Sequence, residues 1–352
     1  MLYKKNFEET KRYFRAFWEK AVLDRPLIAV SAPMNAGAAP PPYLAGAKEN
    51  DFLPALRQFE IFAENTYFAG ESLPAFDVSL GPDQYAAFLG GEIKFAADGG
   101  TTWVSAFWDE QWEGREIKID ASKGSYFDRL ISGIRTAADF AGGRFLVNMA
   151  DLHGNIDALS AARGPENLCT DLYDCPDEIG RAVGAVADTY PFVIDSIAAA
   201  GRMDANGYIG WAPTFCEEKF AVLQCDFSCM LSPEMARRYA IPALEREASH
   251  LKRSVYHYDG INALGHLDDI LAIKNIDVIQ WVPGAGRPRT VEWMDLLRKI
   301  QAAGKGLWIY DWTPDEIKKH HKELKPEGLI FQTWVSTPKE ADELVKHLKR
   351  KF

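Results

Sequence analysis

The sequence predicts an α/β protein, a single (β/α)8 TIM barrel that occupies residues 1–352 as one domain. Short apolar runs alternate with helical segments along the chain, and this alternation implies a parallel sheet. Most runs are rich in Val, Ile, Leu and aromatic residues without strict alternation, as in strands covered on both faces. No Gly-rich dinucleotide motif or Walker loop follows any run, which disfavours an open nucleotide-binding sheet.

The chain begins with a predicted helical extension over residues 1–25. Asn6 is the expected N-cap, with Glu9 three positions later, and Pro26 prevents the helix from continuing. The apolar residues of this segment recur at helical spacing: Phe7, Phe14, Phe17, Trp18 and Ala21. A barrel uses about 250 residues, so a chain of 352 residues has room for this extension and for an insertion, which we place at residues 81–125.

Nine apolar runs are strand candidates, one more than a barrel needs: 27–32, 75–80, 145–150, 207–212, 221–225, 254–258, 277–282, 307–311 and 329–334. Three helices have clear start signals, a hydroxyl residue at the cap followed by proline. They begin at Ser232-Pro233, Thr313-Pro314 and Thr337-Pro338.

The composition of the chain disfavours several classes of protein. The chain has 40 Lys and Arg against 50 Asp and Glu, a net charge of −10, which disfavours nucleic acid as a partner. The five cysteines are an odd number and too sparse for a disulfide scaffold, so we expect free thiols and a cytoplasmic protein. The N-terminus lacks an apolar signal segment, and the uncharged run 26–47 contains five prolines, so no membrane segment is expected.

Polar and aromatic residues stand at the ends of the predicted strands, where a barrel collects its catalytic groups. They are Asp151, His153, Trp211, Asp226, His257, Asp259, Gln280, Trp281 and Gln332. Several carboxylates, two histidines and several aromatic rings would therefore meet at one mouth.

His257-Tyr258-Asp259-Gly260 is the sharpest local motif. Residues 257 and 259 point to the same side of an extended chain, so imidazole and carboxylate can share a proton or bind a cation together. The alternative is a buried histidine satisfied by its neighbour. Asp226 is a candidate acid, base or orienting group, or the cap of a turn.

Asp151 and His153 are standard metal-ligand types, although an ordinary turn also explains them. Gln280 and Trp281 begin a segment that could form a stacking wall, or a strand and turn. Cys225 and Cys229 have no second cysteine pair, so a four-thiolate zinc site is unsupported.

The segments 222–235, 254–260, 151–164 and 336–345 resemble the uroporphyrinogen decarboxylase superfamily. The resemblance spans residues 145–350 well and the N-terminal third loosely. It implies a TIM barrel and one of two reactions, decarboxylation of a tetrapyrrole or methyl transfer involving a corrinoid protein.

The departures from the family favour methyl transfer. True decarboxylases carry arginines after their first strand, whereas residues 31–37 have none. Zinc-dependent methyltransferases use His-x-Cys and a later cysteine, whereas this chain has His257-x-Asp259 and no cysteine in residues 332–334. The resemblance then implies an enzyme that moves a methyl group from a small O- or N-methylated substrate to a corrinoid protein.

In this interpretation His257 and Asp259 are the catalytic acid or hold a divalent metal such as zinc, and Asp226 orients them. The substrate-binding residues are Trp211, Gln280, Trp281, Asp151, His153 and Gln332. The candidate partners are the small-molecule substrate, a corrinoid protein and a second copy of the chain in a homodimer.

Two other enzyme classes stay open. A tetrapyrrole or other carboxylate decarboxylase requires basic groups at the mouth. A sugar-binding or glycoside-hydrolysing barrel would pair Asp226, Asp259 or Asp151, with carboxyl groups about 5–5.5 Å apart for retention and about 6.5–9.5 Å for inversion. A non-catalytic binding protein on the same fold is also compatible with the sequence.

Overall fold

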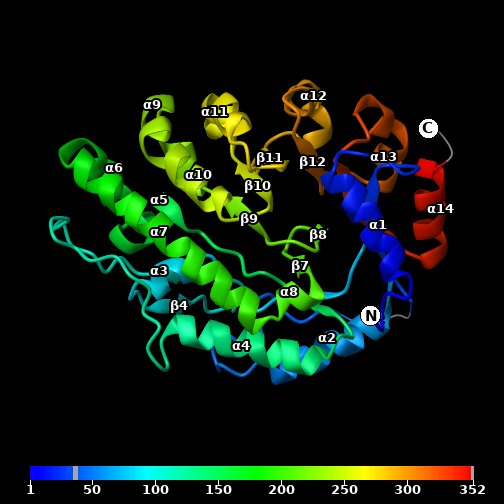
Figure 1. Ribbon diagram of the computed structural model, residues 1–352, viewed down its shortest axis with the longest axis horizontal. Coiled ribbons are helices and arrows are strands. Elements are labelled where there is room, and N and C mark those ends of the chain that lie inside the picture. Colours follow the sequence, from blue (N-terminus) through cyan, green and yellow to red (C-terminus); the bar gives the residue numbers. More distant parts are fainter. Residues whose placement is uncertain (35–38, 350–352) are drawn as a thin grey trace.

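The computed structural model describes residues 1–34 and 39–349. The protein is α/β with a mixed, mostly parallel main sheet (Figure 1). The sheet has seven strands in the order β2 (Thr66–Gly70), β1 (Leu27–Pro33), β13 (Leu329–Trp334), β12 (Gly306–Ile309), β11 (Val278–Val282), β10 (Arg253–Asp259) and β9 (Phe220–Gln224). Every neighbouring pair is parallel except β1 and β2.

Six short strands form three further pairs. β3 (Ala75–Phe76) and β6 (Leu146–Val147) are parallel, whereas β4 (Ile93–Phe95) with β5 (Thr102–Val104) and β7 (Tyr208–Ile209) with β8 (Phe215–Cys216) are antiparallel. One backbone hydrogen bond, from Met149 N to Ile209 O, links the end of β6 to β7. Pairing among the described residues therefore gives one large sheet and three small ones, and the closed ring of strands stays a prediction.

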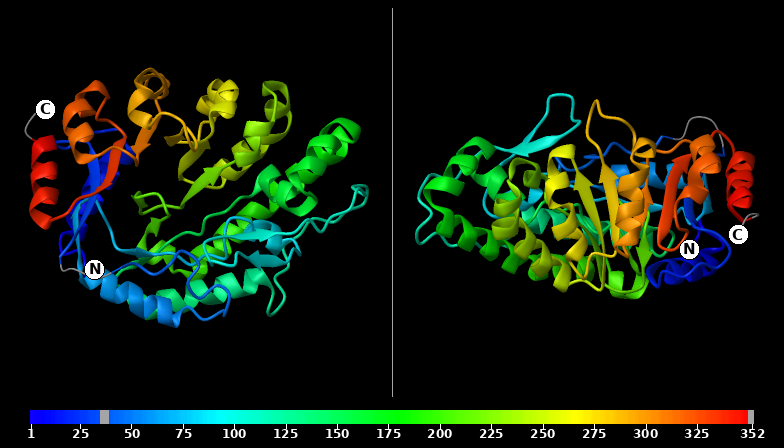
Figure 2. Two further views of the ribbon diagram at one scale, coloured as in Figure 1. Left: turned by 180° about the vertical axis from the view of Figure 1, so that it is seen from behind. Right: turned by 90° about the horizontal axis from the view of Figure 1, so that it is seen from above.

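Helices cover the outside of the strands, and α9 to α13 form an arc along the parallel run (Figures 1 and 2). The helices are α1 (Phe7–Trp18), α2 (Leu53–Glu64), α3 (Gln84–Phe88), α4 (Tyr126–Ala141), α5 (Asn155–Arg163), α6 (Pro165–Asp174), α7 (Pro176–Ala200), α8 (Met203–Asn206), α9 (Pro233–Met235), α10 (Ile241–Ser249), α11 (Leu267–Ala272), α12 (Met294–Ala302), α13 (Pro314–His320) and α14 (Pro338–Lys349). Because helices and the other strand segments enclose the sheet, β9 and β12 are buried along their whole length.

Three helix starts are confirmed by their side-chain caps. Ser232 Oγ accepts from Met235 N at 3.2 Å, and Thr337 Oγ1 accepts from Glu340 N at 3.2 Å. Thr313 forms a full capping box with Glu316. Asn6 is the N-cap residue of α1, as predicted, but its side chain accepts no cap bond, and its amide instead donates to Glu9 Oε2 at 3.4 Å.

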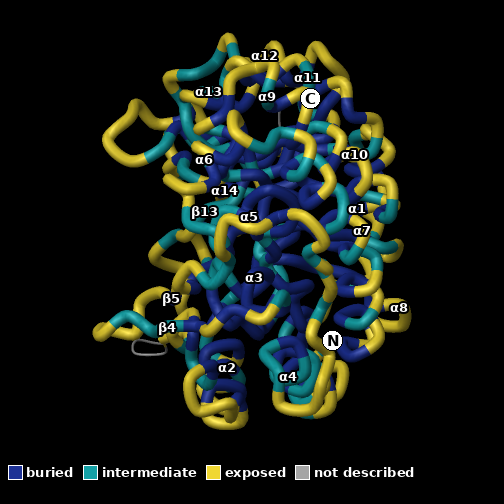
Figure 3. The backbone as a smooth tube through the Cα atoms, turned by 90° about the vertical axis from the view of Figure 1, so that its left-hand side faces the viewer, coloured by how far each residue is buried: buried dark blue, intermediate teal, exposed yellow. Residues whose placement is uncertain are grey.

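Residues 81–125 contain α3, the β4–β5 hairpin and a long coil (Figure 1), and α3 is buried against α4 and α5. Helix α7 is the one helix in the described residues that is long and apolar enough to cross a membrane by length and composition. Half of its most apolar 18-residue stretch is buried, and the helix packs against α4, α5 and α10 (Figure 3). This burial is that of a core helix.

Candidate functional site

The register of three parallel strands builds the centre of the site. His257 on β10 pairs with Gln224 on β9 and with Gln280 on β11, so the three side chains share one face of the sheet. His257 Nδ1 lies 2.6 Å from Gln280 Oε1. With the amide oxygen as acceptor, Nδ1 carries the proton and Nε2 keeps a lone pair for a proton or a metal.

His257 belongs to a group with Asp226 and Asp259. One nitrogen or oxygen atom from each lies within 4.8 Å of the other two. Asp226 opens the 3-10 turn after β9, and Asp259 is the last residue of β10. Burial raises the pKa of Asp259, and Asp226 raises it further while His257 lowers it.

The donor chemistry of this group fits a divalent cation. Asp226 Oδ1 and Asp259 Oδ1 are buried and have no hydrogen-bond partner among the described residues. A buried carboxylate oxygen without a donor is unfavourable, so a proton or a cation between the two groups would stabilise them. Two carboxylate oxygens, one imidazole nitrogen and a second-shell amide on the imidazole are a typical zinc environment.

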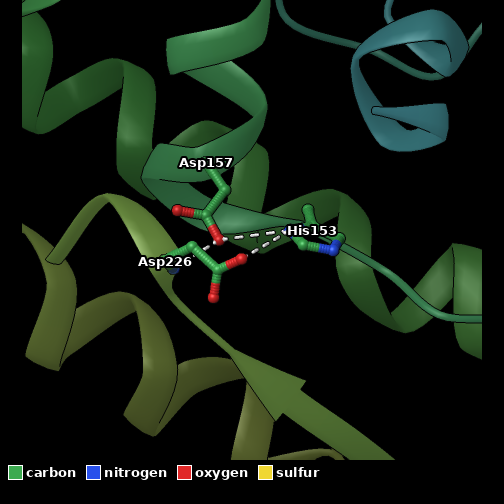
Figure 4. Close-up of side chains that lie close together, drawn as sticks. All are labelled: His153, Asp157 and Asp226. Atoms are coloured by element: carbon green, nitrogen blue, oxygen red, sulfur yellow. Dashed lines mark hydrogen bonds and ion pairs between the residues drawn. The ribbon is translucent and has the colours of Figure 1, made fainter. Parts of the chain in front are cut away.

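Asp226 also belongs to a second group, with His153 and Asp157 (Figure 4). His153 Nδ1 lies 3.5 Å from Asp226 Oδ2 and 3.8 Å from Asp157 Oδ2. Its Nε2 lies 3.7 Å from Asp151 Oδ2. Burial alone would lower the pKa of His153, but these three carboxylates outweigh it and raise the pKa to about 9. His153 is therefore an imidazolium at neutral pH.

The pKa values of the other two carboxylates in this cluster, Asp157 and Asp151, are shifted in opposite directions. Burial and the nearby Asp226 raise the pKa of Asp157 to about 7, although its oxygens accept from the backbone N–H groups of Asp226 and Phe227 at 2.9 and 2.8 Å. Burial would also raise the pKa of Asp151, but His153 and Gln224 overcome it and lower the pKa. Gln224 Nε2 donates to Asp151 Oδ1 at 2.5 Å.

Asn155 fixes the loop that carries His153 and Asp157. It is fully buried and adopts a left-handed conformation with φ of 44°, which strains a residue other than glycine. Its amide donates to Gln224 O at 3.0 Å and to Glu247 Oε2 at 3.1 Å, and its Oδ1 accepts from Asp157 N at 3.3 Å. Burial raises the pKa of Glu247 to about 8 despite the bonds from Asn155.

Two cavities lie at this cluster, one lined by His257 and the other by Asp226. The larger, of about 690 Å³, has His257 at its wall and a lining of Trp211, Gln280, Val282, Trp308, Tyr310, Asp311, Trp312, Thr313, Pro314, Gln332, Thr333 and Trp334. We call it the aromatic cavity. Trp308 Nε1 donates to Gln332 Oε1 at 3.1 Å within it. The other cavity, of about 550 Å³, is lined by Asp83, His153, Asp157 and Asp226 among others. No Lys or Arg is among the described residues that line either cavity.

Most residues predicted for the site do meet there. His257, Asp259, Asp226, Asp151 and His153 form one connected cluster. Trp211, Gln280 and Gln332 line the adjoining cavity.

Trp281 does not join them, which corrects its assignment as a pocket wall. It pairs with Tyr258, one position along from the His257–Gln280 pair, and therefore faces the opposite side of the sheet. There it is buried against the rings of Tyr258 and Trp293, at centroid distances of 5.4 and 5.3 Å.

Sequence reasoning missed several residues of the site. Asp157 stands beside His153 in the sequence but was not assigned a role. Glu247 and Asn155 carry no motif, and their contact spans 92 positions. The five cysteines are free thiols, with Cys216 and Cys225 buried. In the segment 31–37, where arginines are absent, residues 35–37 lie outside the described part of the chain.

Comparison with known proteins shows a similarity of fold. No protein-family model matches the chain, and no curated protein matches it. A solved structure of a methyltransferase from Methanosarcina mazei is similar, with a TM-score of 0.62 over 97% of this chain and 98% of that one. The sequences are 13% identical over the match, so the similarity is one of fold along almost the whole length.

Proposed function

We propose that the protein is a methyltransferase of the uroporphyrinogen-decarboxylase-like type, which moves a methyl group from a small methylated substrate to a corrinoid protein. The single observation that carries the proposal is the Asp226–His257–Asp259 group beside the aromatic cavity. The fold similarity to a methyltransferase and the sequence segments that resemble the superfamily support it.

The proposal includes a barrel of eight strands, β1, β3, β6 and β9 to β13. In that arrangement β2 lies at the joint between β1 and β3, and the β7–β8 hairpin lies at the joint between β6 and β9. The hydrogen bonds from Glu71 N to Ile28 O and from Met149 N to Ile209 O support contact at these two joints. The site residues then occupy the carboxyl ends of the strands, as in other barrel enzymes.

A divalent metal such as zinc would be held by Asp226, Asp259 and Nε2 of His257, and Gln280 would fix the imidazole ring. A metal bound there supplies a Lewis acid for the atom from which the methyl group departs. The residues of the chain do the rest: the aromatic cavity binds the substrate and excludes water, while Gln332 and Trp308 orient it.

The His153 cluster supplies protons to the same centre. His153, with its pKa of about 9, contacts Asp226 beside the cavity that both residues line, and Asp157, with its pKa of about 7, holds a second proton near neutral pH. An alkoxide leaving group needs such a proton because it is otherwise a poor leaving group. With no metal on Asp226, this carboxylate would pass a proton from His153 to the reaction site.

Methyl transfer is favoured over tetrapyrrole decarboxylation by the chemistry of the lining. A substrate with several carboxylates requires Arg or Lys partners. The described lining of both cavities has acidic, amide and aromatic side chains and no such cation.

The test is transfer of a methyl group to reduced cobalamin, followed by the absorption change of the cobalt centre. Methylated ethers and methylated amines are offered as donors, with elemental analysis of the protein used. His257→Ala should abolish transfer and lower the metal content, whereas His250→Ala, at the end of α10 and in the lining of neither cavity, should change neither. Unchanged turnover by His257→Ala would overturn the assignment.

A further inference from the structure

We propose that the substrate is an N-methylated ammonium ion, held in the aromatic cavity by ring faces and nearby carboxylates. The identity of the ligand as a methyl donor rests on the proposed function, whereas its binding is independent of any reaction. The inference follows from two properties of the cavity, its rings and its charge.

The rings form a continuous wall. His257 and Trp211 have centroids 5.2 Å apart, Trp211 and Trp308 5.3 Å, and Trp308 and Tyr310 6.2 Å, with interplanar angles between 59° and 75°. Adjacent rings in this wall are inclined to one another, and all four residues line the aromatic cavity. Aromatic faces carry negative charge density, and clusters of them recognise quaternary ammonium groups.

The charge around this wall is negative. Asp311 lines the cavity, and its carboxylate accepts from Thr290 N at 3.0 Å and from the Thr290 hydroxyl group. Asp226 and Asp259 lie beside His257. Asp311 is thus a carboxylate of the cavity lining itself, and the other two lie next to the wall, beside His257.

No cation of the described lining offsets this charge. Arg289 lies behind Asp311, where its guanidinium group pairs with Glu316 at 2.9 Å and with the Asp311 carbonyl oxygen. A ligand with a permanent positive charge therefore complements the cavity better than a neutral ether or an anion. The volume of about 690 Å³ falls in the range of roughly 300–1,000 Å³ usual for small-molecule sites.

The chemistry of an ammonium donor is also simpler. The N–CH3 bond breaks, its electron pair stays on nitrogen, and a neutral amine leaves without taking up a proton. The methyl group passes to corrinoid cobalt in its reduced Co(I) form, which supplies the electron pair of the new bond.

The experiment compares choline with 3,3-dimethylbutan-1-ol, which has the same shape and no charge. Binding to the protein without corrinoid is measured by calorimetry and by tryptophan fluorescence. We expect choline to bind at least about tenfold more tightly, since a desolvated ring–cation contact contributes about that factor. Equal affinities, or no binding of choline, would overturn the inference.

Variants locate the site. Trp308→Leu should weaken choline binding about tenfold and should change the affinity for the alcohol by less than about twofold. Tyr310→Leu, at the exposed rim, repeats the test if the buried Trp308 proves necessary for folding. Trp103→Leu, exposed on β5, is the matched control and should bind choline as the wild type does. Unchanged binding in both cavity variants would refute the location. Choline binding without methyl transfer would defeat only the proposed function, whereas methyl transfer from ethers without choline binding would defeat only this inference.

Discussion

Replacing Glu247 with glutamine is expected to stabilise the protein at alkaline pH. Glu247 is 2% exposed, and its carboxyl group meets Asn155 as its only side-chain donor among the described residues. Burial raises its pKa from 4.5 to about 8 in the folded protein. The carboxyl group therefore enters the fold as a neutral acid, a state that glutamine reproduces.

The direction in which stability changes with pH follows from the raised pKa of Glu247. Below pH 4.5 the folded and unfolded chains both hold the proton, and Glu247 does not lower the free energy of unfolding. Between pH 4.5 and about 8 only the folded chain holds it, so stability falls as the pH rises through this window. The difference of roughly 3.5 pKa units corresponds to an upper limit of about 5 kcal/mol at pH 8.

Urea denaturation between pH 5 and pH 9 measures the effect. We expect the unfolding free energy of Glu247→Gln to fall less steeply than that of the wild type, with a gap of several kcal/mol at pH 8. His153 contributes to both curves, whereas Asp157 helps to raise the pKa of Glu247, so part of its contribution belongs to the difference between the curves. Glu234→Gln, in the first turn of α9, serves as the control and should follow the wild type. Parallel curves for wild type and Glu247→Gln would show that Glu247 is ionised in the folded protein and would refute the reasoning.

Three further predictions concern the same cluster. Asn155→Ala should destabilise the fold by about 1–2 kcal/mol more than Asn155→Gly, because both lose the same side-chain bonds and only alanine is strained at positive φ; equal urea midpoints would contradict this. Addition of zinc should raise the Tm of the wild type and not that of Asp259→Asn, as thermal unfolding will show. Methyl transfer from an ether should decline as the pH rises through about 9, where His153 loses its proton, and an unchanged pH profile in His153→Gln would exclude it as the proton source.

Much of the site could be predicted because strand ends are visible in a sequence. An apolar run followed by Asp226, or by His257 and Asp259, gives both the strand and the polar group at its end. The side chains met because β9, β10 and β11 are neighbouring parallel strands in register. The same reasoning identified Trp211 and Gln332, which line the aromatic cavity.

The sequence could not predict which face of a strand carries a given side chain, or which contacts the buried polar groups make. Trp281 follows Gln280, and only the pairing of Gln280 with His257 decides which of the two faces the site. The link between Asn155 and Glu247 joins a loop to α10 through tertiary packing, which no local pattern encodes. Strand β2 was missed because it follows α2 after one residue, Asn65, and pairs antiparallel to β1.

The sharing of Asp226 by two groups ties metal occupancy to acidity. A divalent cation on Asp226 and Asp259 would withdraw the negative charge that keeps the proton on His153. Uptake of the cation should then expel a proton into the solvent, and by reciprocity a more acidic solution should weaken cation binding. At Asp226 the protein would thus exchange a proton for a metal cation, and the metal occupancy would depend on the pH of the solution.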